Sequence, residues 1–229
     1  MDIIDQVKSY IQYIKQNPYI YEIQKQGIEL FMKFLRQKPE RIEKDSLDKD
    51  LIDYFLSFWV PKNKKYLSEV QAYNIVYTVH DIFTYVHNKL NEEIEYPLIL
   101  DIYGQEYVRL YKSRKLLAQL SGDPVLIAHP MVISFDAYKE YKQKKKKRDS
   151  MSMYEQGVFK VEEISREGYI SLNKIGTNRN FRVLFRPSLL INFKEGDILH
   201  ITLRRKIFFV YWEIEEIKGY YLSAAIAYF

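Results

Sequence analysis

The stretch SEVQAYNIVYTVHDIFTYVHNKL, residues 68–90, decides the fold of the N-terminal half of this chain. Apolar side chains recur along it at intervals of three and four, the spacing that places them on one face of an α-helix. They are Ala72, Ile75, Val76, Val79, Ile82, Phe83, Val86 and Leu90. Ser68 and Gln71 have the spacing of a capping box, in which each side chain bonds the backbone N–H of the other residue. We therefore predict a long helix that begins just after Ser68.

The same periodicity predicts further helices on both sides of this segment, at residues 3–15, 19–37, 47–60 and 102–120. Pro18 and Pro39 separate or end the first two, because the residue before a proline avoids the α region. Ser46 is the expected N-cap of the third. Residues 1–140 are therefore predicted to form a helical domain, a bundle of about five helices.

The pattern changes after Gly157, where the apolar runs become short and the helical spacing fades. Expected strands lie at residues 158–164, 169–172, 181–186, 198–203, 207–214 and 220–229. The residues Lys194-Glu195-Gly196-Asp197 predict a β-turn, since glycine permits a positive φ. Short strands with glycine-marked turns predict a small antiparallel β-barrel-like domain at residues 157–229. A basic linker at residues 141–156 would join it to the helical domain, so the predicted fold class is α+β.

The composition limits the class of protein. The 229 residues include no cysteine, which excludes disulfides, thiolate catalysis and zinc sites built on cysteine, and fits a reducing compartment. No apolar run reaches the roughly 18 residues of a membrane-spanning helix. The first residues carry Asp2 and Asp5 instead of a basic segment followed by an apolar run, which predicts no signal peptide. We expect a cytoplasmic protein with no membrane partner.

Motifs that would name a reaction do not occur in the sequence: there is no glycine-rich phosphate loop, nucleophile elbow or HExxH. His80 and His87 share a helix face but lie two turns apart, about 10 Å, which is too far for a shared metal ion. The adjacent carboxylates Glu162-Glu163 would point to opposite sides of a strand. We therefore predict no catalytic residue, no metal site and no cofactor, and we favour a protein that is not an enzyme.

The net charge of +5 is concentrated in two places. A five-residue basic run lies in the predicted linker, and arginine dominates residues 171–210, where carboxylates are scarce. Basic runs bind phosphate backbones by releasing counterions, and arginine binds phosphate bidentately. Arg182 and Arg186 would share one face of a regular strand. The candidate nucleic-acid-binding residues are Lys144, Lys145, Lys146, Lys147, Arg148, Arg179, Arg182, Arg186, Arg204, Arg205 and Lys206.

Both basic features have a second interpretation. The lysine run also fits a solvated linker. Four aromatic residues lie among or near the arginines, namely Phe181, Phe185, Tyr211 and Trp212. Their rings could be a platform on which bases stack, or they could belong to the core of the domain. The composition alone leaves both interpretations open.

Three stretches of the N-terminal half share their apolar spacing with a known domain. They are GIELFMKFL at residues 27–35, SLDKDLIDYFL at residues 46–56, and Leu67-Ser68-Glu69 leading into the long helix. Through them, residues 22–90 resemble the helical core-binding (SAM-like) domain of phage integrases and tyrosine recombinases. The resemblance implies a domain that clamps DNA. It does not extend to that family's catalytic domain, because the His-x-x-Arg motif is missing: the four histidines are followed three places on by Phe83, Leu90, Val132 and Leu203.

A stripe of Tyr73, Tyr77, His80, Thr84 and His87 runs beside the apolar face of the long helix. Tyrosine and histidine have an apolar body and a polar tip, which suits either packing within the chain or a partner groove. Two hypotheses follow. In the first, the β domain binds DNA or RNA without catalysis and the helical half supports it. In the second, the protein is a protein–protein interaction or self-association module with no nucleic-acid role, and the stripe is a candidate surface for a homo-oligomer.

Overall fold

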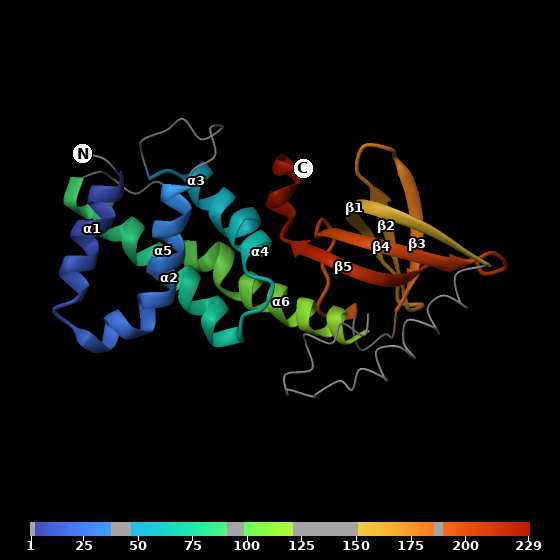
Figure 1. The fold of residues 1–229 in the computed structure, drawn as a ribbon, viewed down its shortest axis with the longest axis horizontal. Coiled ribbons are helices and arrows are strands. Elements are labelled where there is room, and N and C mark those ends of the chain that lie inside the picture. Colours follow the sequence, from blue (N-terminus) through green and yellow to red (C-terminus); the bar gives the residue numbers. More distant parts are fainter. Residues whose placement is uncertain (1–2, 38–46, 91–98, 121–150, 186–189) are drawn as a thin grey trace, which may run out of the picture. The chain divides into compact units, whose positions relative to one another are not determined.

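The computed structural model describes residues 3–37, 47–90, 99–120, 151–185 and 190–229 (Figure 1). The chain divides into two compact units. The helical unit comprises Met1–Lys112 and Ala224–Phe229, and the sheet unit comprises Ser113–Ser223. Helices come first and strands second, so the predicted α+β fold class is confirmed.

The helices occupy the segments that the apolar spacing predicts. They are α1 (Ile3–Ile14), α2 (Pro18–Arg36), a continuous segment of α3 (Lys49–Asp53), η1 (Tyr54–Trp59) and α4 (Val60–Asn63), then α5 (Glu69–Leu90) and α6 (Ile99–Leu120). The segment η1 is a π-helix, in which the N–H of Val60 bonds the carbonyl of Phe55. This wider turn immediately precedes Pro61, whose ring would clash with the carbonyl four residues earlier in a regular α-helix.

The helix starts show how local chemistry sets the boundaries. The capping box ahead of α5 is confirmed: the N–H of Ser68 donates to Gln71 Oε1 at 2.9 Å, and the N–H of Gln71 donates to Ser68 Oγ at 3.1 Å. The third helix is capped by Asp48, whose Oδ1 accepts from the N–H of Leu51 at 2.9 Å. The expectation of Ser46 as its N-cap is therefore wrong, because a carboxylate closer to the first turn takes that role. Ser46 itself lies outside the described residues.

Aromatic rings fill the core of the helical unit. Phe55 packs edge-on against Phe31 at a centroid distance of 4.9 Å and also contacts Phe34 and Trp59. All four of these side chains are buried. The last residues of the chain join the same unit, where the Tyr228 ring lies 4.7 Å from that of Tyr54.

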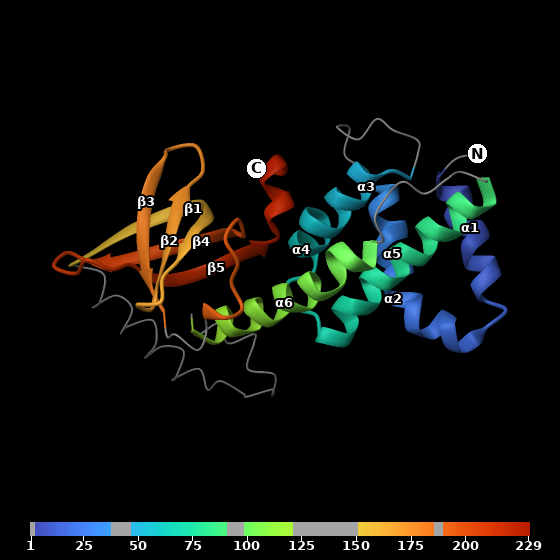
Figure 2. The ribbon, with the colours of Figure 1, turned by 180° about the vertical axis from the view of Figure 1, so that it is seen from behind.

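Helices α2 and α5 pack closely at one glycine. A Cβ added at Gly27 would lie 2.5 Å from Thr78 Oγ1 and 2.7 Å from Thr78 Cβ, so no larger side chain fits there without a shift. Figures 1 and 2 show α1, α2 and α5 side by side in both views. The apolar stripe of α5 is buried from Ala72 to Val86.

The sheet unit contains five antiparallel strands in the order β3-β2-β1-β4-β5. They are β1 (Ser152–Ile164), β2 (Tyr169–Lys174), β3 (Arg179–Leu184), β4 (Ile198–Lys206) and β5 (Glu213–Tyr221). Three consecutive strands form a meander and the fourth returns to pair with the first, which is a Greek-key order. The predicted turn before β4 is present, with Gly196 at a φ of 91°.

The sheet curls without closing into a barrel. Figures 1 and 2 show the β2–β3 hairpin running across the direction of β4 and β5. Between β3 and the start of β5 there is an isolated parallel bridge, Val183 to Trp212, and not a ladder. The N–H of Trp212 donates to the Arg182 carbonyl at 2.8 Å, and its carbonyl accepts from the N–H of Leu184 at 3.1 Å. The barrel-like prediction is thus correct for the small antiparallel sheet but not for closure.

Two strand predictions are corrected by the structure. Residues 207–212 were expected in a strand but form the turn of the β4–β5 hairpin. The expected strand at 220–229 contains only the end of β5, followed by the 3₁₀-helix η4 (Ser223–Tyr228). Strand β1 also begins at Ser152, ahead of the predicted start at 158. Within the parts of the chain described above, no helix has the length and apolar character needed to cross a membrane.

Candidate nucleic-acid interface

Inward-facing positions of the sheet alternate along each strand, and at one end of the sheet they change from apolar to charged. On β3 the buried residues Phe181 and Val183 share their parity with Arg179. On β2 the buried Ile170 and Leu172 share theirs with Lys174, and on β4 the buried Leu203 shares its parity with Arg205. We call Lys174, Arg179 and Arg205 the cationic rim.

One carboxylate, Glu155 on β1, meets two members of the rim. It forms an ion pair with Lys174, and its Oε2 lies 3.3 Å from Arg179 Nη1. Glu155 and Lys174 are largely buried, whereas the side chain of Arg179 is 60% exposed. A single carboxylate between two cations leaves the rim positively charged.

Arg205 is held differently from the other two. Its guanidinium lies over the buried ring of Trp212, with the carbon 5.0 Å from the ring centroid, and its Nη2 faces Met153 Sδ at 3.4 Å. Its Nε is buried and meets no hydrogen-bond acceptor in the described part of the chain. Thioether sulfur is a weak acceptor, and no carboxylate in the described part of the chain pairs with Arg205, so its charge is not balanced there.

Rings connect Arg205 to Arg179 across the end of the sheet. The Trp212 ring packs edge-on against Phe181 at 5.3 Å, and the Arg179 guanidinium lies 5.4 Å from the Phe181 centroid. Both rings are buried, so they act as a floor beneath the two cations and are not exposed stacking platforms. The sequence left the role of Phe181 and Trp212 open, and here they belong to the core.

The neighbouring arginine has the opposite environment. Arg204 Nη2 lies 2.8 Å from Glu213 and its Nε lies 3.5 Å from Glu215, both on β5. The hydrogen bond to Glu213 and the nearby carboxylates raise the pKa of Arg204 above its ordinary value despite its burial. Two carboxylates balance this one cation, so Arg204 has little charge left for a phosphate.

Arg182 and Lys206 project from the outer face of the sheet, because their parity differs from that of the rim. The Arg182 guanidinium lies 5.5 Å from the centroid of Tyr169, and the Lys206 ammonium lies 5.2 Å from that of Phe209. The Tyr169 ring in turn lies 6.0 Å from Tyr211. Cations and accessible rings therefore alternate around the turn of the β4–β5 hairpin.

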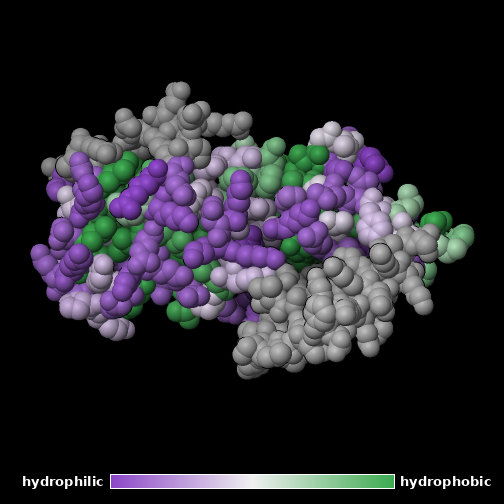
Figure 3. Space-filling view, in the orientation of Figure 1, coloured by the Kyte–Doolittle hydropathy of each residue, from purple (hydrophilic) through white to green (hydrophobic). Residues whose placement is uncertain are grey.

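That turn exposes four consecutive apolar residues, which we call the hairpin tip. Their exposed fractions are 53% for Ile207, 88% for Phe208, 59% for Phe209 and 70% for Val210. Figure 3 shows hydrophobic surface at the end of the sheet unit where Figure 1 draws this hairpin. Soluble proteins rarely expose such a run without an interaction that uses it.

The structure therefore brings together some of the predicted site residues and separates others. Arg179 and Arg205 share the rim with Lys174, while Arg182 and Lys206 lie on the outer face and Arg204 is neutralised. Arg186 and the run from Lys144 to Arg148 lie outside the described residues. The prediction that these residues bind nucleic acid stays a prediction.

Sequence reasoning missed the hairpin tip. The run Ile207-Phe208-Phe209-Val210 reads as a buried strand because a short apolar run fits a strand, and no glycine, asparagine or proline marks the turn. It also missed Glu155, because only the register of β1 against β2 and β4 places that carboxylate beside Lys174.

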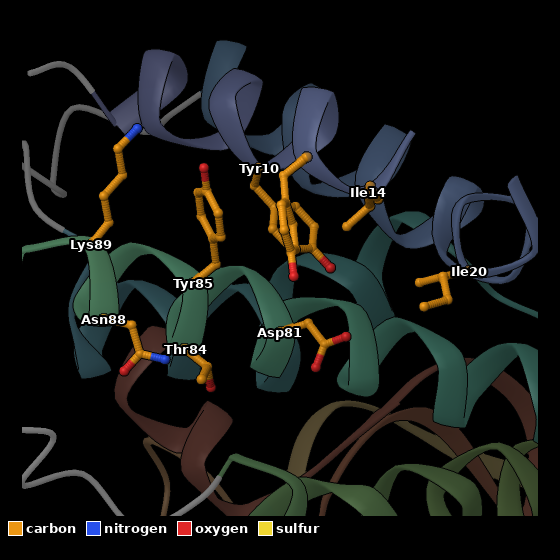
Figure 4. A pocket seen from close by; sticks show the side chains of 9 residues that line it. Tyr10, Ile14, Ile20, Asp81, Thr84, Tyr85, Asn88 and Lys89 are labelled. Atoms are coloured by element: carbon orange, nitrogen blue, oxygen red, sulfur yellow. The ribbon is translucent and has the colours of Figure 1, made fainter. Parts of the chain in front are cut away.

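The helical unit has a groove of its own, of about 530 Å³, between α1, the start of α2 and the end of α5 (Figure 4). It is lined by Tyr10, Tyr13, Ile14, Ile20, Asp81, Thr84, Tyr85, Asn88 and Lys89. Tyrosine rings beside a carboxylate could hold an organic cation. However, the Lys89 ammonium already lies 5.8 Å from the Tyr85 ring centroid, so the chain supplies its own cation there.

Several polar groups around this groove bond one another, whereas the buried Thr84 Oγ1 has no hydrogen-bond partner among the described residues. The Tyr10 hydroxyl donates to Gln24 Oε1, and Gln24 Nε2 donates to Asp81 Oδ2 at 2.6 Å. Burial, followed by the nearby Asp81 carboxylate, raises the pKa of Tyr10 well above its ordinary value. Asp81 also raises the pKa of Tyr77. These hydrogen bonds connect α1, α2 and α5.

Members of the tyrosine–histidine stripe on α5 have contacts within the helical unit. Tyr77 bonds Asp81, and the His87 ring stacks on Phe83 at 3.9 Å while its Nδ1 lies 3.0 Å from the Phe83 carbonyl. Self-association through the stripe stays a prediction. Across the described ranges, no group of histidines and carboxylates is arranged to hold a metal ion.

Comparison with protein-family models, with curated proteins and with solved structures finds no match to this chain. The class of site therefore rests on the geometry of the sheet unit alone.

Proposed function

We propose that the sheet unit binds single-stranded nucleic acid along the cationic rim and the adjoining β4–β5 hairpin. The observation that carries the proposal is Arg205, an arginine flattened on Trp212 without a carboxylate to balance it among the described residues. A guanidinium fixed in this way is pre-organised to bond phosphate oxygens, because little side-chain freedom is left to lose.

Charge and rings occur together here, as binding of a single strand requires. Lys174 and Arg179 extend the positive charge from Arg205 along one end of the sheet. Phe209 and Tyr211 offer exposed ring surface beside it. Cationic grooves track the sugar-phosphate backbone, while accessible rings stack on unpaired bases.

The architecture supports the same proposal. A five-stranded, partly open Greek-key sheet is the framework on which oligonucleotide-binding folds use a sheet face and the loop between the fourth and fifth strands. In this chain that loop is the β4–β5 hairpin. The resemblance of residues 22–90 to a DNA-clamping helical domain points to the same class of ligand. Catalysis is not part of the proposal.

The test measures binding of labelled oligo-dT and oligo-rU, each of about 20 nucleotides, enough for at least one such domain. Fluorescence anisotropy would be recorded at about 50 and 200 mM salt, because phosphate contacts make affinity fall steeply with salt. We expect Arg205→Ala to weaken binding and to lower the salt slope by about one. Comparing the two oligomers distinguishes DNA from RNA.

The matched control is Lys160→Ala, which removes one exposed cation from β1 of the same unit. We expect it to leave affinity and salt slope nearly unchanged, because Lys160 lies outside the rim and the hairpin. The proposal is wrong if the wild-type protein binds neither oligomer at low salt, or if its affinity does not depend on salt.

A further inference from the structure

The hairpin tip has a geometry that binding of phosphates does not require. Phe208 is the most exposed of the large apolar side chains in the described residues, and the residues on both sides of it are also exposed. Burying such side chains on a partner favours binding, because it removes apolar surface from water. A tip of this kind is suited to insertion into an apolar space and is poorly suited to lying in water.

The base of the tip is fastened to the sheet on both sides. The N–H of Ile207 donates to the Met151 carbonyl at 3.2 Å, and the N–H of Phe209 donates to the Lys206 carbonyl at 2.9 Å. On the far side, Trp212 makes two backbone bonds to β3. The exposed side chains therefore project from a supported turn, which lets the tip act as a wedge.

The charges beside the hairpin tip indicate which kind of ligand could receive its apolar side chains. Lys206 and Arg205 flank the tip on β4, and Lys206 lies over the Phe209 ring. On the β5 side, Glu213 is paired with Arg204, so the charge next to the tip is that of the two cations on β4. Apolar residues beside cations complement a ligand that is apolar inside and anionic outside. A stack of bases between phosphate chains has that chemistry, and proteins insert Phe and Ile side chains between base steps.

The cost of separating stacked bases decides where on a nucleic acid such a wedge would insert most favourably. Opening an internal base step costs a few kcal/mol, whereas the last pair of a duplex already has one open face. A wedge therefore gains most where a single strand leaves a duplex. The rim, next to the tip through Arg205, would hold the departing strand.

We propose that the hairpin tip inserts at single-strand–duplex junctions, with Phe208 stacked on the terminal base pair. This inference rests on the proposed binding of single strands and adds the class of substrate to it. It makes the sheet unit selective for forked nucleic acid over an unpaired strand or a blunt duplex.

The experiment compares three labelled probes: a fork, a single strand and a blunt duplex. Wild-type protein is expected to bind the fork most tightly. Phe208→Ala should lower the affinity for the fork about tenfold, because one stacked base is worth roughly one to three kcal/mol. The affinity of this variant for the single strand should stay nearly the same. The matched control is Ile191→Ala, which removes an apolar side chain that is 83% exposed elsewhere in the sheet unit. A 2-aminopurine at the junction should brighten on binding of wild type and of the Ile191 variant only.

Each outcome has one meaning. Loss of fork preference in the Phe208 variant alone supports the wedge. Equal fork affinity in the wild type and the Phe208 variant overturns the wedge and leaves the proposed function standing, whereas no binding of any probe overturns both. Anionic vesicles are a parallel arm: sedimentation of wild type but not of the Phe208 variant with them, without fork preference, would show that the tip serves a membrane surface and would overturn the wedge.

Discussion

Two apolar, aromatic runs in this molecule have opposite environments. Residues 55–60 (FLSFWV) in the helical unit are buried, while the hairpin tip (IFFV) in the sheet unit is exposed. The buried run lies in a helical segment against α2, so its rings meet Phe31 and Phe34. The exposed run lies in a turn, and the adjoining strands direct it away from the sheet. Apolar composition therefore does not decide burial; the element that carries the run does.

The largest expected effect comes from truncating a ring in the buried run. Phe55→Ala removes contacts with Phe31, Phe34 and Trp59, and we expect it to lower the free energy of unfolding by about 3–5 kcal/mol. Phe208→Ala, the same change in the exposed run, should alter it by no more than about 0.5 kcal/mol. Urea denaturation followed by circular dichroism measures both. Similar losses in the two variants would break the comparison.

A smaller loss of stability is expected from a change at the contact between α2 and α5. Gly27→Ala would press a Cβ into Thr78, and we expect a loss of about 1–3 kcal/mol, even though alanine favours a helix. Gly104→Ala is the matched control, because its nearest neighbour, Tyr73 Cε2, would lie 3.6 Å away in ordinary contact. That variant should be slightly more stable than wild type. The same urea titration applies, and a harmless Gly27 variant would contradict the close approach of α2 and α5.

The smallest expected effect is a dependence of the sheet unit's stability on pH, which arises from His200. Burial, then Lys218, lowers the pKa of His200 on β4, while Glu216 acts in the opposite direction. The unfolded chain therefore takes up this proton at a higher pH than the folded sheet unit. Stability contributed by the neutral ring is present above about pH 6.5 and declines as the pH falls below it.

Tryptophan fluorescence can measure this decline in stability for the sheet unit by itself. The chain has two tryptophans, and Trp212 reports on the sheet unit alone in a Trp59→Phe background. We expect the urea midpoint to fall less between pH 7.5 and 5.5 when His200 is replaced by Gln. Equal declines with and without His200 would show that this histidine does not contribute.

Much of the fold could be predicted from local signals. Helical periodicity and the pair Ser68 and Gln71 located α5, because both act within a few residues of sequence. The glycine turn before β4 was predictable for the same reason. The hairpin tip was not, since burial depends on strand register and not on the composition of residues 207–210.

The candidate site was predictable only as a basic region. Arg204 and Arg205 are adjacent and chemically identical, yet one meets two glutamates of β5 and the other meets Trp212 and Met153. Alternation along β4 sends their side chains to opposite faces, and each side chain then meets different partners on the neighbouring strands and the hairpin turn. Counting charges along the sequence cannot separate a neutralised cation from an available one.

The division of the chain has a consequence for its synthesis. Residues 224–229 belong to the helical unit, although they follow the whole sheet unit in sequence. Tyr228 and Phe229 contact Tyr54 and Phe58, which emerge from the ribosome much earlier. Because domains fold as they are translated, those two early rings must wait for residues 224–229. The helical unit therefore completes its packing only after the whole sheet unit has been made.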